Sequence, residues 1–151
     1  MIFQKCILIV LVLPLLLAGC MGNNRVRNEM AGQIHVFGVE LFSDVDYREI
    51  NGVVAAEEPC LRGYERSFDA LDVIVGYGFD KKVRKITTRN INTSMFGVKP
   101  GMELQEGRKV ILQAGFSESA PPFTFSSSGC SLTFLVDGNN KLFGLRLESL
   151  D

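Results

Sequence analysis

The sequence has no tryptophan, a single histidine (His35) and four cysteines. The scarcity of histidine and cysteine restricts the catalytic and metal-binding sites that the chain can form. A histidine that acts as a general base needs a nucleophile within reach and a group that orients it, and the flanking Ile34 and Val36 offer neither. No HExxH, CxxC or glycine-rich phosphate-binding motif occurs, and the serine run 126–128 has no GxSxG frame. We therefore predict that the protein is not an enzyme and holds no metal or cofactor.

An excess of positive charge is also lacking. Sixteen lysines and arginines face 17 aspartates and glutamates, which gives a formal net charge of −1. Proteins that bind nucleic acids concentrate lysine and arginine on one face to neutralise phosphates. The composition therefore argues against a nucleic-acid partner.

The one long apolar run extends from Ile7 to Leu17 and is interrupted by Pro14. Its length is about half of the roughly 20 residues that a helix needs to cross a bilayer. A basic residue, Lys5, precedes the run, and small residues follow it, as is typical of a secretory signal. Residues 1–19 are therefore predicted to be a cleaved leader rather than a membrane span.

The four residues Leu17-Ala18-Gly19-Cys20 resemble the lipobox of bacterial lipoprotein signals. The resemblance implies cleavage before Cys20 and acylation of its thiol, and two or three acyl chains anchor a protein firmly. The alternative is an ordinary signal peptide with a chance cysteine. We expect an extracytoplasmic lipoprotein, anchored by lipid to the cell membrane or the outer membrane.

The mature chain is predicted to be a polar tether over residues 20–33 followed by one domain over 34–151. The two cysteines in that domain are Cys60 and Cys130. An even pair in an exported domain suggests a disulfide, which would close a loop of about 70 residues and contribute roughly 4 kcal/mol. The alternative is two separate buried thiols.

A weak internal repeat is present. Phe37-Gly38-Val39 recurs 59 positions later as Phe96-Gly97-Val98, and residues 71–88 match 130–147 in pattern. The repeat predicts two tandem units over 36–90 and 95–149, each a helical or irregular segment followed by an antiparallel hairpin.

Alternating apolar residues predict strands over 71–79 and 83–88 in the first unit, and over 132–136 and 143–147 in the second. The turn residues Asp137-Gly138-Asn139-Asn140 connect the second pair.

A helix is predicted over 103–114, ended by Gly115, with a shorter helical counterpart over 45–50. The predicted fold class is α+β, with one or two short helices packed on an antiparallel sheet.

The segment from Phe96 to Met102, with Val110 and Gly115 after it, resembles a turn-and-helix pattern of exported bacterial proteins. It is similar to the small lipoproteins of outer-membrane-protein assembly and to the tandem-repeat β-lactamase inhibitor protein. The strand end Ile86-Thr87-Thr88-Arg89-Asn90 also resembles uncharacterised exported lipoproteins. The resemblance implies a fold only, and the stretch from Gly101 to Gly115 is about one helical turn longer than usual.

Two hypotheses for function follow. The first is a non-enzymatic domain that binds a protein or another cell-envelope component, through a sheet edge or through the loop that carries Phe116, Phe123 and Phe125. The second is a small-ligand or metal sensor in which the acids of residues 44–49 converge with His35.

Overall fold

The computed structural model describes residues 30, 32–119 and 122–150. The predicted leader, Cys20 and most of the tether lie outside the described residues. In chain order the elements are β1 (Ile34–His35), β2 (Glu49–Ile50), β3 (Val53–Val54), β4 (Ala56–Cys60), β5 (Gly63–Phe68), the 3-10 turn η1 (Asp69–Leu71), β6 (Val73–Gly78), β7 (Val83–Thr88), β8 (Ser94–Met95), α2 (Leu104–Gln113), β9 (Ser117–Ser119), β10 (Thr124–Ser127), β11 (Cys130–Val136) and β12 (Leu142–Ser149).

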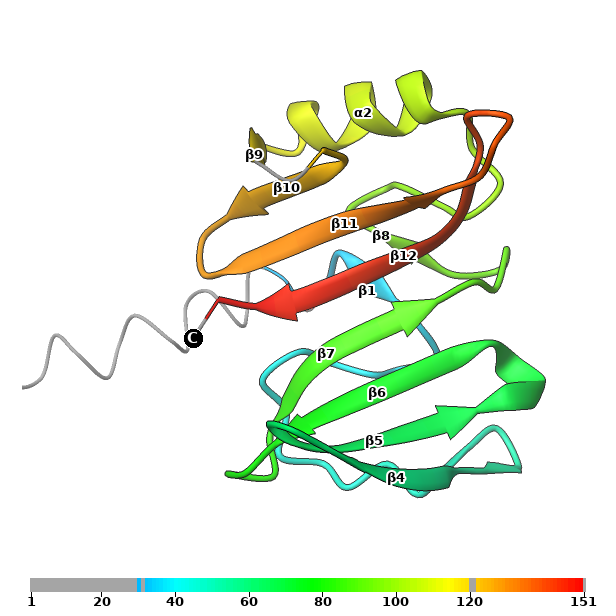
Figure 1. Cartoon of the computed structure of the whole chain (residues 1–151), viewed down its shortest axis with the longest axis vertical. Helices are drawn as coiled ribbons and strands as arrows, with labels where there is room; N and C mark the ends of the chain where they lie inside the picture. The colour runs from blue at the N-terminus through cyan, green and yellow to red at the C-terminus, as the bar shows by residue number, and fades with distance from the viewer. Residues whose placement is uncertain (1–29, 31, 120–121, 151) are drawn as a thin grey trace, which may run out of the picture.

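One eight-stranded sheet organises the domain (Figure 1). Its order is β4-β5-β6-β7-β12-β11-β10-β9, and every neighbouring pair is antiparallel. The pairing of β7 with β12 joins a half made of four consecutive strands to a second such half. Two small sheets, β1 with β8 and β2 with β3, complete the described strands.

The predicted α+β class is wrong, because the fold is mainly β and resembles a β-sandwich. The described residues are 47% strand and include one short α-helix, α2. The helical counterpart expected over 45–50 does not form. Asn51 and Gly52 adopt positive φ angles of 50° and 79° and close a two-residue hairpin in which Ile50 pairs with Val53. Asn-Gly is a strong hairpin signal, and the hairpin places the last two residues of this segment in strand β2 instead of a helix.

The helix predicted over 103–114 is present as α2, and it ends where Gly115 indicated. Gly115 has a φ of 90°, its N–H donates to Leu112 O at 3.1 Å, and Phe116 N–H donates to Ile111 O at 3.3 Å. This is the Schellman pattern of a helix end. Inside the helix, a Cβ on Gly107 would lie 2.8 Å from Leu142 Cδ1. The missing side chain thus allows α2 to pack closely on the sheet.

The core lies between the sheet and the layer formed by α2, the β1–β8 pair and the loops that join them. The side of the sheet that faces this layer is called the inner face. Its buried side chains come from both halves of the sheet: Phe68, Val73, Val75, Tyr77, Val83, Ile86, Phe125, Leu132, Phe134, Leu142, Leu145 and Leu147. In Figure 1 the sheet lies in front, with β1 and β8 behind it.

The two predicted repeats share one turn in detail. Phe37 and Gly38 have φ angles of 51° and 79°, and Phe96 and Gly97 have 53° and 81°. Each turn is closed by an equivalent hydrogen bond. Val39 N–H donates to Val36 O at 3.0 Å in the first unit, and Val98 N–H donates to Met95 O at 2.9 Å in the second. The first unit nevertheless lacks the helix, so a helix-plus-hairpin description fits the second unit alone.

Candidate functional site

The side of the sheet away from the core is called the outer face, and strand register places two rows of side chains across it. One row runs through Glu58, Glu65, Gly76, Lys85, Glu148, Ser131, Ser126 and Ser117. The other runs through Ala56, Ser67, Ile74, Thr87, Arg146, Thr133, Thr124 and Ser119. Nearly all of these side chains are charged or carry hydroxyl groups, so this face is polar across its whole width.

The outer face is hollowed. Thr87, Ser131 and Thr124 are only 6%, 8% and 9% exposed, although the helix and the small sheets among the described residues pack on the inner face. Their burial must therefore come from neighbouring side chains on the same face.

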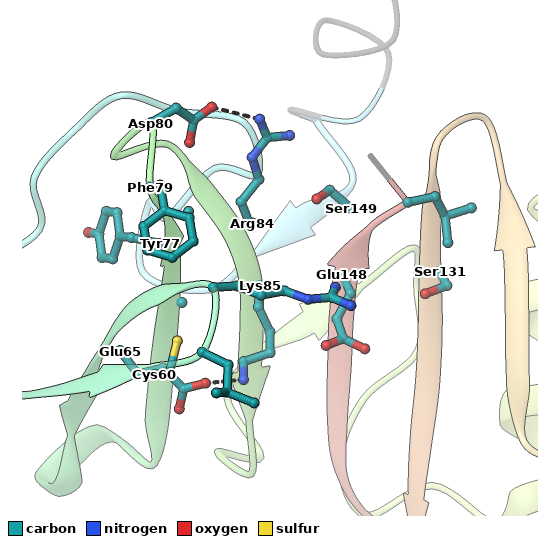
Figure 2. A pocket seen from close by; sticks show the side chains of 15 residues that line it. Cys60, Glu65, Tyr77, Phe79, Asp80, Arg84, Lys85, Ser131, Glu148 and Ser149 are labelled. Atoms are coloured by element: carbon teal, nitrogen blue, oxygen red, sulfur yellow. Dashed lines mark hydrogen bonds and ion pairs between the residues drawn. The ribbon is translucent and has the colours of Figure 1, made fainter.

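A groove of about 1000 Å³ lies on this face, with Ser131 among its lining residues (Figure 2). Its floor contains Gly76 of β6, Lys85 of β7, Glu148 of β12 and Ser131 of β11. The groove therefore straddles the β7–β12 junction between the two halves of the sheet. A pocket of this size suits a small ligand or several residues of a partner chain.

An ion pair crosses the groove floor. Lys85 Nζ donates to Glu65 on β5, with β6 between the two strands. A Cβ on Gly76 would lie 3.0 Å from Lys85 Cβ and 3.2 Å from its Cε. The absence of a side chain at Gly76 therefore gives Lys85 the room to extend across β6, as Figure 2 shows.

The rim of the groove is apolar at one end. Leu61, Phe79 and Leu150 line it and are 98%, 82% and 58% exposed. A second ion pair fixes the turn that carries Phe79, because Arg84 Nη2 donates to Asp80 Oδ2 at 2.6 Å. Hydrogen bonding to Arg84, aided by Lys82 N–H, lowers the pKa of Asp80.

A separate charged cluster lies on the inner face around Arg66, which is 4% exposed. Its Nε and Nη2 donate to Glu57 Oε2 at 2.9 and 2.8 Å, and its Nη1 donates to Asp46. The guanidinium lies 5.1 and 5.3 Å from the ring centroids of Tyr64 and Tyr77. These contacts tie the loop over residues 44–48 to the sheet, so the cluster is structural.

The charges in this cluster are stabilised by one another. Burial opposes ionisation of Arg66, but hydrogen bonds to Asp46 and Glu57 outweigh it and raise the pKa of Arg66. Hydrogen bonds from Arg48 and then Arg66 lower the pKa of Asp46. Burial raises the pKa of Tyr77 to about 12.

The metal hypothesis finds no support at the predicted acids. The carboxylate of Asp46 is occupied by two arginines, and His35 lies on β1, opposite Ser94 of β8. In the described part of the chain, no three His, Cys, Asp or Glu side chains gather closely enough to hold a metal ion.

The predicted disulfide between Cys60 and Cys130 is wrong, because both are free thiols. Cys60 ends β4 and Cys130 begins β11, five strand spacings apart in the sheet order. At about 4.8 Å per spacing the separation is roughly 24 Å along the sheet, far beyond the 7 Å limit for a bridge. Cys60 is exposed at the groove, whereas Cys130 is buried, and burial raises the pKa of its thiol to about 11.

The predicted aromatic contact loop is also wrong for two of its three residues. Phe125 is fully buried, Phe116 is 6% exposed, and Phe123 alone reaches the surface at 37%. The first two belong to the core, where Phe125 packs against Phe134 with ring centroids 4.8 Å apart. Alternation in strand β10 places Phe125 on the inner face, but sequence alone could not show which face that would be.

A sheet edge is a poor contact surface in this fold. Edge strand β4 carries Glu57, Glu58 and Pro59, and the opposite edge strand, β9, has only three residues. Charges, proline and short length are the devices by which proteins prevent pairing at an edge. The outer face, rather than an edge or the aromatic loop, is therefore the candidate site.

Sequence reasoning missed the groove residues Glu65, Gly76, Lys85 and Glu148. The alternation over 71–79 and 83–88 did assign Gly76 and Lys85 to strands. Glu148 joins them through the β7–β12 pairing, which connects residues about 60 positions apart and leaves no local signal.

Among residues 30, 32–119 and 122–150, no helix is both long and apolar enough to cross a bilayer. No known protein family matches the chain, and neither a curated protein nor a solved structure matches it.

Proposed function

We propose that the protein is a lipid-anchored, extracytoplasmic binding protein whose outer sheet face holds a protein or another component of the cell envelope. Its role is binding rather than catalysis. The single observation that supports the binding role is the hollowed outer face, which combines a groove of about 1000 Å³ with rows of charged and hydroxyl side chains.

The anchor is supported by the first twenty residues. A short apolar run after one lysine is followed by Leu17-Ala18-Gly19-Cys20, the residue types that a lipoprotein signal needs. An acylated Cys20 would hold the domain close to one membrane and raise its effective concentration toward partners there.

A binding role fits the chemistry of the groove. Lys85 is paired with Glu65 and Arg84 with Asp80, so these four charged groups are already satisfied in the absence of a ligand. Charged groups distributed over a concave surface favour a partner with complementary charges. A mismatched partner would remove these groups from water without offering them polar contacts, which costs binding free energy.

The anchor is tested by mass spectrometry of the native protein. We expect an N-terminal peptide that begins at Cys20 and carries the mass of a thioether-linked diacylglycerol. Cys20→Ser should abolish the lipid and release the domain from membranes into the soluble extracytoplasmic fraction. A native chain that retains residues 1–19, or that carries a bare Cys20, would rule out the anchor.

The binding face is tested by reversing the ion pair on the groove floor. The double variant Lys85→Glu/Glu65→Lys keeps the pair but inverts the charge pattern, and we expect unchanged folding with loss of the partner recovered from crosslinked membranes. The matched control is Arg108→Glu/Glu118→Arg, which inverts an exposed ion pair between α2 and β9. Equal partner recovery from the floor variant and the control would exclude the groove.

A further inference from the structure

Several turns of the large sheet meet at one end of it. Cys60 pairs with Gly63 and Gly63 with Gly78 in one half of the sheet, and Cys130 pairs with Ser149 in the other. The pairing of Lys85 with Glu148 joins the halves, so the connections between these strands lie at the same end. This end, called the turn end, consists of residues 61–62, 79–82 and 128–129 together with Leu150. Leu150 N–H donates to Gly129 O at 2.8 Å, which holds the last described residue there.

The turn end carries three exposed apolar side chains. Leu61, Phe79 and Leu150 are 98%, 82% and 58% exposed, and all three line the groove. A single exposed leucine is ordinary, but three large exposed apolar side chains at one end of a sheet offer a surface for another apolar partner. Leu61 and Phe79 sit at the tips of tight turns, where they contribute little to the core.

Cations flank two of these apolar side chains, Leu61 and Phe79. Arg62, Lys81 and Lys82 belong to the same two turns and are exposed. The one acid within these turns, Asp80, is paired with Arg84. Apolar side chains flanked by lysine and arginine are typical of surfaces that rest in the headgroup region of an anionic bilayer.

The chain enters the domain at this same end. Met30 is 7% exposed, and its sulfur lies 3.5 Å from Cys130 Sγ at the start of β11. Cys20 precedes Met30 by ten positions in the sequence. Ten residues span at most about 36 Å, so a lipid on Cys20 would keep the turn end near the bilayer.

We propose that the turn end docks on the membrane, with Leu61, Phe79 and Leu150 in the headgroup region and Arg62, Lys81 and Lys82 against anionic lipid. This inference rests on the proposed lipid anchor. Docking at the turn end fixes the orientation of the domain, because the eight strands then extend from the bilayer surface into the solvent. The groove opens beside the membrane surface, so its partner is a molecule that is itself at that surface.

The experiment uses the fact that the chain has no tryptophan. Phe79→Trp places a single fluorophore at the turn end, and Phe143→Trp places one at a 45% exposed position near the other end of β12. The acylated full chain is reconstituted into vesicles of phosphatidylcholine and phosphatidylglycerol with brominated acyl chains, which quench tryptophan near the bilayer. We expect a blue shift and loss of emission for Phe79→Trp, and neither change for Phe143→Trp.

A charge variant tests the electrostatic part. Adding Lys81→Gln/Lys82→Gln to Phe79→Trp should weaken docking by about fivefold per cation removed, seen as recovery of emission. The control pair Lys99→Gln/Lys109→Gln removes two exposed cations elsewhere and should leave the quenching unchanged.

The outcomes separate this inference from the proposed function. Equal emission from Phe79→Trp in brominated and plain vesicles, with the chain acylated and vesicle-bound, would overturn the docking and leave the anchor intact. Stronger quenching of Phe143→Trp would overturn it in the same way. An unacylated Cys20, measured by mass on the same preparation, would overturn both.

Discussion

Removal of the Arg66 guanidinium should cost more stability than removal of any exposed charge in this domain. Arg66 is 4% exposed and donates to Glu57 and Asp46, which are themselves 55% and 46% exposed. Because both carboxylates can be rehydrated, each ion pair is worth at most about 1 kcal/mol. The two stacked tyrosine rings add about 1–2 kcal/mol. The buried stem adds roughly 1 kcal/mol.

Arg66→Ala should therefore lower the free energy of unfolding by up to about 4–5 kcal/mol, the sum of the contributions above. Arg66→Lys keeps the charge and the stem but loses the two-pronged contact with Glu57, so it should lose about 1–2 kcal/mol. Urea unfolding at pH 7 measures both. The control Arg108→Ala breaks an exposed pair with Glu118 and should cost less than about 1 kcal/mol. If Arg66→Ala costs no more than Arg108→Ala, the structural role assigned to the inner-face cluster is wrong.

Three further predictions concern the thiols, the pH dependence and the groove. A maleimide should modify Cys60 rapidly in the native chain and Cys130 only after unfolding, and a disulfide-linked peptide in the mass spectrum would contradict the strand order. Because the pKa of Asp46 lies below its ordinary value of 3.8 in the folded state, its stabilisation is present above that pH and lost as the pH falls further. Acid unfolding should be shallower in Asp46→Asn, and an unchanged acid limb would contradict the pairing. Gly76→Val should displace Lys85 and fill the groove, so partner recovery should drop. The unfolding midpoint should fall as well, because a Cβ at position 76 would lie 3.0 Å from Lys85 Cβ.

Local signals in the sequence predicted local structure well. Glu103 to Gly115 gave the helix and its end, because a Schellman end depends on one glycine and the residues just before it. The hairpin β11–β12 followed from alternation and from the turn at Asp137-Gly138-Asn139-Asn140, whose Asp137 Oδ1 accepts from Asn139 N–H at 2.8 Å. Such features need only a few consecutive residues.

The missed features depend on distant residues or on competition between signals. The Asn51-Gly52 hairpin overrode the helical spacing of residues 45–50. The even number of cysteines in the domain, Cys60 and Cys130, suggested a disulfide, but the strand order of the sheet keeps the two residues far apart. The groove forms only when β7 lies beside β12. The lack of a side chain at Gly76 has a consequence only because Lys85 lies opposite it on β7. Strand order of this kind is set by the packing of the whole core rather than by any one segment.

Binding of a partner at the outer face is tested by site-specific photo-crosslinking in intact cells. A photoreactive residue is placed at Thr133 on the outer face and, as the comparison, at Leu112, which is 43% exposed on α2. We expect a defined crosslinked product from position 133 that is lost in the Lys85→Glu/Glu65→Lys variant, and none from position 112. A product from position 112 with none from position 133 would contradict binding at the outer face.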